Sequence, residues 1–263
     1  VPRFVDWPVK SRDDWEQIKA ERLRPTLEGR LPANWEALKE HFRRRTFPLA
    51  IGGGQTGFFG ALRNLLGEEN ALLSFYDDQQ LVRQIINDLC DLWIVLFDQI
   101  LDEVGVDLAL LWEDMCYKTG PLVSPALVRE FMLPAYKRLT GFLRERGVHI
   151  VLLDTDGNCW SLIPLFIEGG ITGLYPFEVN AGMDVVAVRE AFPRLQILGG
   201  IDKMALASGP PRIQCELESK VPTMLRAGGY IPFVDHHVPP DVSWSNFAYY
   251  RARLNHIIDN AAQ

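Results

Sequence analysis

The stretch VHIVLLDTDGN, residues 148–158, is the most informative part of the chain for its fold. An apolar run stops there at two aspartates, a glycine and an asparagine. Buried parallel strands have nearly continuous apolar sequences. In a β/α barrel, the residues just past the C-terminal ends of the strands carry the chemistry. The stretch therefore predicts a buried strand whose end delivers Asp154 and Asp156 to a site.

The same pattern, an apolar run that ends in polar residues, occurs five more times. Helical periodicity fills the intervals, and strands that alternate with helices indicate a parallel sheet with right-handed crossovers. The predicted helices cover residues 78–103, 124–146, 159–168, 184–191, 211–227 and 243–261. The other five runs are 47–51 before Gly52 to Gln55, 108–112 before Glu113 and Asp114, 171–177 before Glu178, 195–201 before Asp202 and Lys203, and 230–234 before Asp235, His236 and His237.

The pattern predicts an α/β fold of the (β/α)8 TIM type, either complete or lacking one or two N-terminal strands. The 263 residues fit a single barrel domain, in which residues 1–46 would be an N-terminal extension or incomplete first barrel units. A six-stranded doubly wound sheet is the rival architecture. Against it, no GxGxxG phosphate-binding motif follows a first strand, and residues 52–57 resemble that motif only weakly.

Composition excludes several classes of partner. The formal net charge of −7 argues against nucleic acid, which needs a basic surface. No apolar run approaches the roughly 20 residues of a membrane span. Four scattered cysteines without a CxxC pair indicate a reducing, cytoplasmic compartment. The chain opens on Val1 rather than Met, which suggests processing, truncation or a fragment.

Asp154 and Asp156 form the most informative polar cluster. Carboxylates two positions apart at a strand end can point to the same side. They could bind a hard cation, or share a proton with one pKa raised for acid–base chemistry. An aspartate-rich turn that ends in a helix cap at Asn158 is the structural alternative.

His236 and His237 form the second cluster, since an imidazole can ligate metals or carry protons near neutral pH. Adjacent residues of an extended chain face opposite ways, so one of the two is expected to face the site. Two histidines in a surface loop are the alternative.

The remaining candidates are acidic or basic residues near the strand ends. Alone, each is more often a helix cap or part of a structural ion pair. Together they predict a cluster of acidic side chains at the C-terminal ends of the strands. Such a cluster would bind a cation, raise the pKa values of some of its carboxyl groups, or pair with a basic side chain. We expect Glu113 to act as a catalytic base or ligand, and we expect substrate contacts from Gln55, Arg63, Glu178, Asp202, Lys203 and His237.

Three ordered segments between Gly120 and Asn246 resemble the uroporphyrinogen decarboxylase superfamily. The first is Gly120-Pro121-Leu122-Val123-Ser124-Pro125 with Phe131 and Pro134-Ala135-Tyr136. The second is Gly199-Gly200-Ile201-Asp202 with Leu206 and Gly209, and the third runs from Gly228-Gly229-Tyr230 through His236 and Pro239 to Asn246. The resemblance implies a β/α barrel.

The superfamily contains a tetrapyrrole decarboxylase and methyltransferases that exchange methyl groups with corrinoid proteins. The methyltransferases hold zinc with a His-x-Cys pair and a later Cys. The resemblance places Asp154, Asp156 and His236 at those positions. A divalent metal, most simply zinc, and a corrinoid donor or acceptor are therefore implied, with oxygen and nitrogen ligands in place of thiolates.

The combined expectation is a cytoplasmic enzyme, either a methyltransferase or a carboxy-lyase. Metal-assisted methyl transfer or demethylation is the favoured reaction, with Asp154, Asp156 and His236 as ligands and catalytic groups. Metal-free decarboxylation of a tetrapyrrole or another carboxylated substrate is the alternative. The expected partners are a small-molecule or tetrapyrrole substrate, a corrinoid protein and a second copy of the chain, because an incomplete barrel would expose a strand edge.

Overall fold

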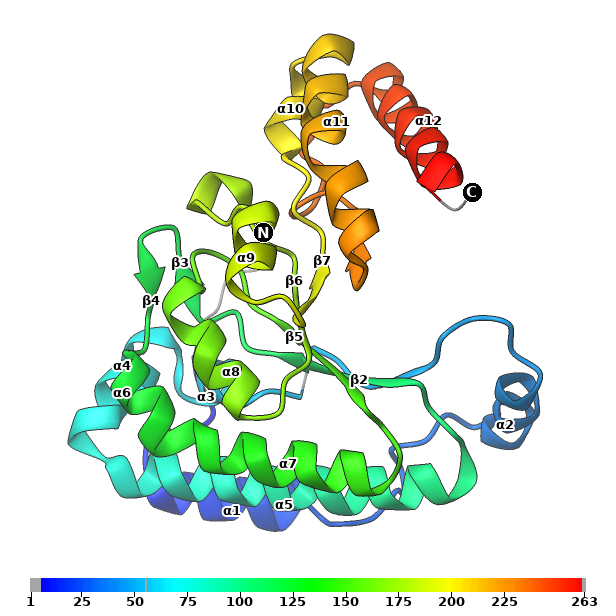
Figure 1. Ribbon diagram of the computed structural model, residues 1–263. Coiled ribbons are helices and arrows are strands. Elements are labelled where there is room, and N and C mark those ends of the chain that lie inside the picture. The colour runs from blue at the N-terminus through cyan, green and yellow to red at the C-terminus, as the bar shows by residue number, and fades with distance from the viewer. Residues whose placement is uncertain (1–5, 55, 262–263) are drawn as a thin grey trace. The chain divides into compact units, whose positions relative to one another are not determined.

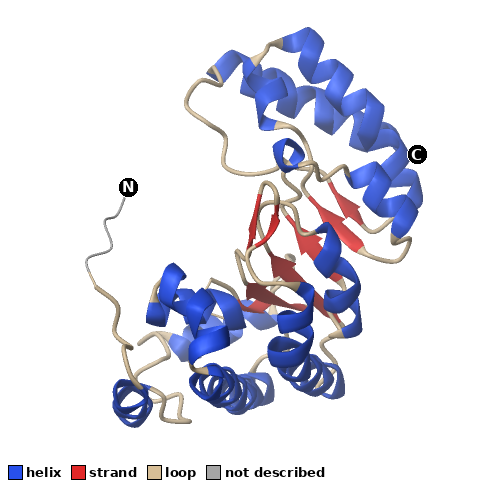
Figure 2. Ribbon diagram, turned by 90° about the vertical axis from the view of Figure 1, so that its left-hand side faces the viewer, coloured by secondary structure: helices blue, strands red, loops and turns tan. Residues whose placement is uncertain are grey.

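The computed structural model describes residues 6–54 and 56–261. Gln55, predicted to contact substrate, lies outside the described residues, as do residues 1–5 and 262–263. Most of the described chain is helical, and its strands are short (Figure 2). Six strands are hydrogen-bonded in the order β1 (Ala50–Gly52), β2 (Leu108–Trp112), β5 (Ile150–Asp154), β6 (Gly173–Tyr175), β7 (Gln196–Leu198) and β8 (Tyr230–Ile231).

Each predicted apolar run overlaps one of these strands, and each predicted helical interval contains helix. The pairings of β1 with β2, β6 with β7 and β7 with β8 are parallel, with Ala50 opposite Leu108, Gly173 opposite Gln196 and Ile197 opposite Tyr230. The predicted α/β class with parallel strands is therefore confirmed. The described residues 6–46 contribute two helices, α1 (Arg12–Arg22) and α2 (Trp35–Arg43).

The chain divides into two compact units. Unit 1 comprises Val1–Asp114, Leu122–Leu153 and Leu162–Ile171, and unit 2 comprises Met115–Pro121, Asp154–Ser161 and Thr172–Gln263. That the whole chain forms one barrel domain stays a prediction. Among the described residues, no helix is both long enough and apolar enough to cross a membrane.

Unit 1 is built around aromatic side chains from several helices. Helices α5 and α7 run side by side in it (Figure 1). Phe58, Tyr136 and Phe166 are buried, and the Tyr136 ring lies 5.0 Å from Phe58 and 6.1 Å from Phe166 between centroids. Its further helices are α3 (Phe58–Leu66), α4 (Glu68–Asp77), α5 (Gln79–Glu103), α6 (Pro125–Leu127), the π-helical turn η1 (Val128–Met132), α7 (Leu133–Glu145) and α8 (Ile163–Glu168).

Unit 2 has its own apolar core. Helices α11 (Pro210–Ala227) and α12 (Trp244–Ala261) pack together in it (Figure 1). Its core includes the fully buried Ile213, Leu217 and Leu254. A bridge between Ile201 and Val234 extends the β7–β8 pairing toward the strand ends. Its other elements are the hairpin β3 (Cys116–Tyr117) and β4 (Gly120–Pro121), the helices α9 (Val185–Ala191) and α10 (Lys203–Ala207), and the 3₁₀ turn η3 (Val179–Ala181).

Candidate active site

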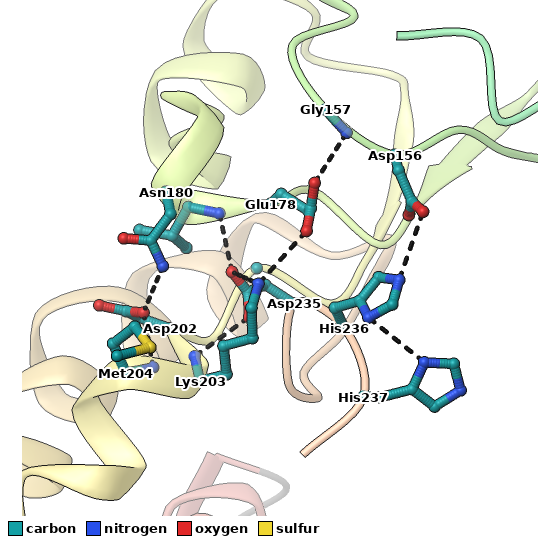
Figure 3. A network of polar contacts seen from close by, with 12 residues as sticks. Asp156, Gly157, Glu178, Asn180, Asp202, Lys203, Met204, Asp235, His236 and His237 are labelled. Atoms are coloured by element: carbon teal, nitrogen blue, oxygen red, sulfur yellow. Dashed lines mark hydrogen bonds and ion pairs between the residues drawn. The ribbon is translucent and has the colours of Figure 1, made fainter. Parts of the chain in front are cut away.

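Asp235 is the centre of a polar network in unit 2 (Figure 3). It directly follows the bridged Val234 and is fully buried. Its Oδ2 accepts the backbone N–H of Val179 at 2.9 Å, and its Oδ1 accepts the backbone N–H of Lys203 at 3.0 Å. The Lys203 ammonium lies 3.4 Å from Oδ2. Burial raises the pKa of Asp235, and these donors oppose that shift.

Lys203 joins Asp235 to a second carboxylate. It is the first residue of α10, and its Nζ lies 3.3 Å from Oε1 of Glu178. The other oxygen of Glu178 accepts the backbone N–H of Gly157 at 3.0 Å. Glu178 therefore connects the segment after β5 to the segment after β7. Phe177, the residue before Glu178, has a left-handed backbone with φ 62°, which is uncommon for a bulky side chain and recurs at functional sites.

Asp156 and His236 form the part of the network that is open to solvent. Nε2 of His236 lies 3.3 Å from Oδ2 of Asp156, and about a third of each side chain is exposed. The predicted proximity of an aspartate in the cluster at 154–156 to His236 is confirmed. The exposed His237 also takes part, because its Nδ1 lies 3.3 Å from Nδ1 of His236. The expectation that one of the two rings faces the site stays a prediction, because the His237 ring contacts the network through His236 (Figure 3).

The other two predicted aspartates are Asp202, which precedes α10, and Asp154, which ends β5, and their predicted roles in the site stay predictions. Oδ1 of Asp202 accepts the backbone N–H of Met204 at 2.9 Å and so caps α10. The same oxygen accepts a bond from the Asn180 amide at 3.3 Å. Asp154 ends β5 near Tyr175, whose phenol pKa is raised first by burial and then by the Asp154 charge.

Glu113 lies at the end of β2 in unit 1 and is fully buried. Oε1 accepts the backbone N–H of Phe58 at 2.8 Å and the Tyr136 hydroxyl at 2.6 Å. Oε2 accepts the N–H groups of Phe59 and Gly60 at 2.6 and 3.1 Å. The carboxylate thus caps the N-terminus of α3, where helices leave N–H groups unsatisfied. Burial raises the pKa of Glu113 to about 7, against the effect of the four donors.

The sequence around α3 explains this cap. The helix begins after Gly57, which offers no side chain to cap it. A Cβ at Gly57 would lie 1.7 Å from the carbonyl oxygen of Trp112, so only glycine lets the helix start against the end of β2. Arg63, on the same helix, pairs with Asp114 at 2.8 Å and lies over the Trp112 ring. Its predicted contact with substrate stays a prediction.

Comparison with known proteins places the chain in a family. The uroporphyrinogen decarboxylase (URO-D) family model matches residues 1–254. The chain belongs to this family. The family match agrees with the predicted barrel class and confirms the resemblance seen in the three segments between Gly120 and Asn246.

One solved structure with the same fold is a methyltransferase from Methanosarcina mazei. The match has a TM-score of 0.61 and 18% identity, and it covers 88% of this URO-D family chain and 69% of the methyltransferase. No curated protein matched the sequence.

The metal predicted from the family resemblance can be tested against the donors present. Among residues 6–54 and 56–261, no three His, Cys, Asp or Glu side chains lie together as a group that could hold a metal ion. Asp156 and His236 are adjacent, but in the described part of the chain they do not belong to a group of three such side chains. The residues as arranged therefore do not fit a metal that needs three protein ligands.

Sequence reasoning missed one buried polar residue in each unit of this URO-D family chain. Asp235 was visible beside His236 and His237, but nothing in the sequence shows that its carboxylate turns inward to the N–H groups of Val179 and Lys203. Tyr136 stands in the first segment of the family resemblance, and its hydroxyl contact with Glu113 required the packing of α7.

Proposed function

We propose that this chain is a carboxy-lyase that decarboxylates a substrate and protonates the resulting carbanion without a metal. The observation that carries the proposal is the Asp156–His236–His237 chain, in which two successive contacts of 3.3 Å lead from a carboxylate to an exposed imidazole. A histidine oriented by a carboxylate and connected to solvent is suited to proton transfer near neutral pH. Membership of the URO-D family supports this reaction class.

The proposed step is balanced by the side chains of unit 2 and the substrate. The bond to the departing carboxylate breaks, CO2 leaves, and the electron pair remains on the substrate carbon. Protonated His236 donates its proton to that carbon, while the contact with Asp156 holds the ring in place. His236 then regains a proton from water through His237. The substrate must supply its own conjugated electron sink, as a tetrapyrrole or another unsaturated acid does.

Lys203 is the proposed binding group for a second substrate carboxylate. Its ammonium is partly exposed and has three N–H donors, of which the contacts with Glu178 and Asp235 use two. Both contacts are longer than the distances usual for charged hydrogen bonds, so the ammonium can accept a better partner. The acidic neighbours also limit the site to few anionic groups, because further carboxylates would meet Glu178 and Asp235.

The test is CO2 release from a panel of unsaturated carboxylates that includes uroporphyrinogen. We expect His236→Ala and Asp156→Ala to lower the rate by at least about 100-fold, the usual contribution of a positioned acid or base. The product formed in D2O should carry one deuterium at the new C–H bond. His149→Gln, on an exposed histidine outside the network, is the matched control and should keep the wild-type rate. Full activity of His236→Ala would refute the assignment.

Metal-assisted methyl transfer to a small acceptor, with a corrinoid protein as partner, is the second candidate function. Two observations favour it: Asp156 and His236 bring an oxygen and a nitrogen donor together, and a methyltransferase shares the fold. Asp154 would have to join them as the third ligand. Calorimetric titration of chelator-treated protein with Zn²⁺ separates the candidates. Binding that disappears in Asp156→Ala supports the metal site, absence of binding removes it, and binding that survives the substitution identifies other ligands.

A further inference from the structure

Helix α11 carries two charged residues on its buried face. Glu216 and Lys220 lie one turn apart, and their side chains are only 9% and 12% exposed. They follow the same face as the buried Ile213, Leu217 and Val221. A buried ion pair is weak evidence for stability, because desolvation can exceed the attraction between the charges. The pair therefore needs an explanation beyond the stability of the helix.

Both charges bond to the segment that joins β7 to α10. Oε1 of Glu216 accepts the backbone N–H of Asp202 at 3.0 Å. The Lys220 ammonium donates to the carbonyl of Gly200 at 3.2 Å and also to Glu216. The Tyr230 hydroxyl donates to the carbonyl of Gly199 at 3.0 Å. Side chains therefore reach peptide groups of this segment that its neighbouring strands leave free.

The other peptide groups of residues 199–202 bond to backbone. The N–H groups of Gly199, Gly200 and Ile201 donate to the carbonyls of residues 231, 176 and 233. The carbonyl of Ile201 accepts from the N–H of residue 235, and that of Asp202 accepts from residue 205. Every backbone N–H and C=O from residue 199 to residue 202 thus has a partner. Such complete bonding fixes the segment that immediately precedes Lys203.

Close packing adds to this restraint. Gly199 has φ 103°, and a Cβ there would lie 2.2 Å from the carbonyl oxygen of Pro176. Only glycine permits both this backbone conformation and this approach. The segment is therefore held both by the backbone around Pro176 and by Glu216 and Lys220.

We propose that Glu216 and Lys220 are positioning residues, which hold residues 199–202 so that Lys203 meets Asp235 and Glu178 and presents its ammonium to a substrate carboxylate. The last clause rests on the proposed function, in which Lys203 binds that carboxylate. The bonds to Gly200 and Asp202 support the positioning of residues 199–202, which does not depend on any substrate.

The test replaces the pair by apolar residues of similar volume, Glu216→Leu with Lys220→Met. Such replacements of buried ion pairs are often neutral for stability, so the fold should persist. Hydrogen exchange of peptides spanning residues 199–206 should become about tenfold faster at the Asp202 and Lys203 amides, since each loses a bond or its support. Glu218→Gln is the matched control, because Glu218 lies on the same helix and pairs with the α12 residue Arg253.

Binding of succinate, a simple dicarboxylate, provides the second measurement. The double variant should bind it at least about fivefold more weakly than wild type, and Lys203→Met should lose the binding. Faster exchange without succinate binding by the wild type would support the positioning role and count against the proposed function. Succinate binding with unchanged exchange in the double variant would overturn the positioning role.

The single variant Glu216→Gln guards against failure of the double variant to fold. It keeps an oxygen that can accept the Asp202 N–H, so we expect a smaller acceleration, about threefold. Exchange at Asp202 equal to that of the wild type would contradict the proposal. Loss of folding in both variants, with Glu218→Gln intact, would assign the pair to stability alone and would also contradict it.

Discussion

Glu113 in unit 1 and Asp235 in unit 2 are both fully buried carboxylates that follow a strand, and both accept backbone N–H groups. Their other partners differ. Glu113 receives a tyrosine hydroxyl, whereas Asp235 receives a lysine ammonium that also contacts the partly exposed Glu178. A carboxylate closed off by uncharged donors serves the packing of its unit. A carboxylate coupled through a cation to solvent-accessible groups can take part in chemistry.

The largest loss of stability should come from removing the Glu113 carboxylate. Glu113→Ala leaves three backbone N–H groups and the Tyr136 hydroxyl without their acceptor in a buried place. Each such group costs about 1 kcal/mol or more, so we expect a loss of at least about 4 kcal/mol in the free energy of unfolding. Urea denaturation followed by circular dichroism measures it. Glu69→Ala, on an exposed residue of α4, is the control, and a loss below about 1 kcal/mol for Glu113→Ala would contradict the assigned role.

The pH dependence of stability tests the same residue. The folded-state pKa of Glu113 is raised from 4.5 to about 7, so the folded protein binds this proton more tightly than the unfolded chain does. Its contribution is therefore fully present below pH 4.5 and is lost as pH rises to about 7, by roughly 3 kcal/mol.

The measurement is the difference in unfolding free energy between wild type and Glu113→Gln, which cannot titrate at this position. We expect the wild type to lose stability relative to the variant between pH 5 and pH 8. A difference that stays constant or grows in favour of the wild type would mean that the four donors keep the carboxylate ionised throughout.

A double-mutant cycle should show an energetic coupling between Asp235 and Lys203. Asp235→Asn and Lys203→Met each leave the other residue without its charged partner, so the two losses of stability should not add. We expect a coupling energy of about 1–2 kcal/mol, because both groups are largely buried. The more exposed pair Glu218–Arg253 in the same unit is the control and should couple by less than about 1 kcal/mol. Additive losses at Asp235 and Lys203 would remove the distinction between the two carboxylates.

The smallest expected effect is the difference of about 1 kcal/mol between the losses caused by removing one tyrosine hydroxyl from each unit. Tyr136→Phe removes a bond to a carboxylate, for which we expect a loss of about 2 kcal/mol. Tyr230→Phe removes a bond to the carbonyl of Gly199, for which about 1 kcal/mol is expected. Tyr76→Phe, at an exposed position, should change nothing measurable. Equal losses at Tyr136 and Tyr230 would show that the charge of Glu113 adds little to the first bond.

Apolar runs in the sequence were sufficient to predict the strands. The approach of Asp156 to His236, which lie 80 positions apart, was predictable because the ends of parallel barrel strands converge and because the family resemblance assigns both residues to one site. The sequence was not sufficient for Glu113. The groups that enclose this carboxylate come from 53 to 55 positions upstream and 23 positions downstream. The partners of Asp235 could not be predicted for the same reason, since they lie 56 and 32 positions away in the sequence. In the sequence, Glu113 and Asp235 are both acidic residues that follow a strand. Only the packing of the surrounding elements decides whether such a carboxylate is enclosed by uncharged donors or linked to solvent-accessible groups.

The large sequence separation between Glu113 and its hydrogen-bond partners also affects how unit 1 folds during synthesis on the ribosome. When α3 leaves the ribosome, the carboxylate that completes its first turn has not been made, and the tyrosine that closes over that carboxylate follows later still. A nascent chain that ends before Glu113 would therefore hold an uncapped helix, and one that ends before Tyr136 would leave the acidic side chain without its hydroxyl donor. Unit 1 should consequently reach its native arrangement only after α7 has emerged, which makes the first half of the chain dependent on delayed, non-local contacts.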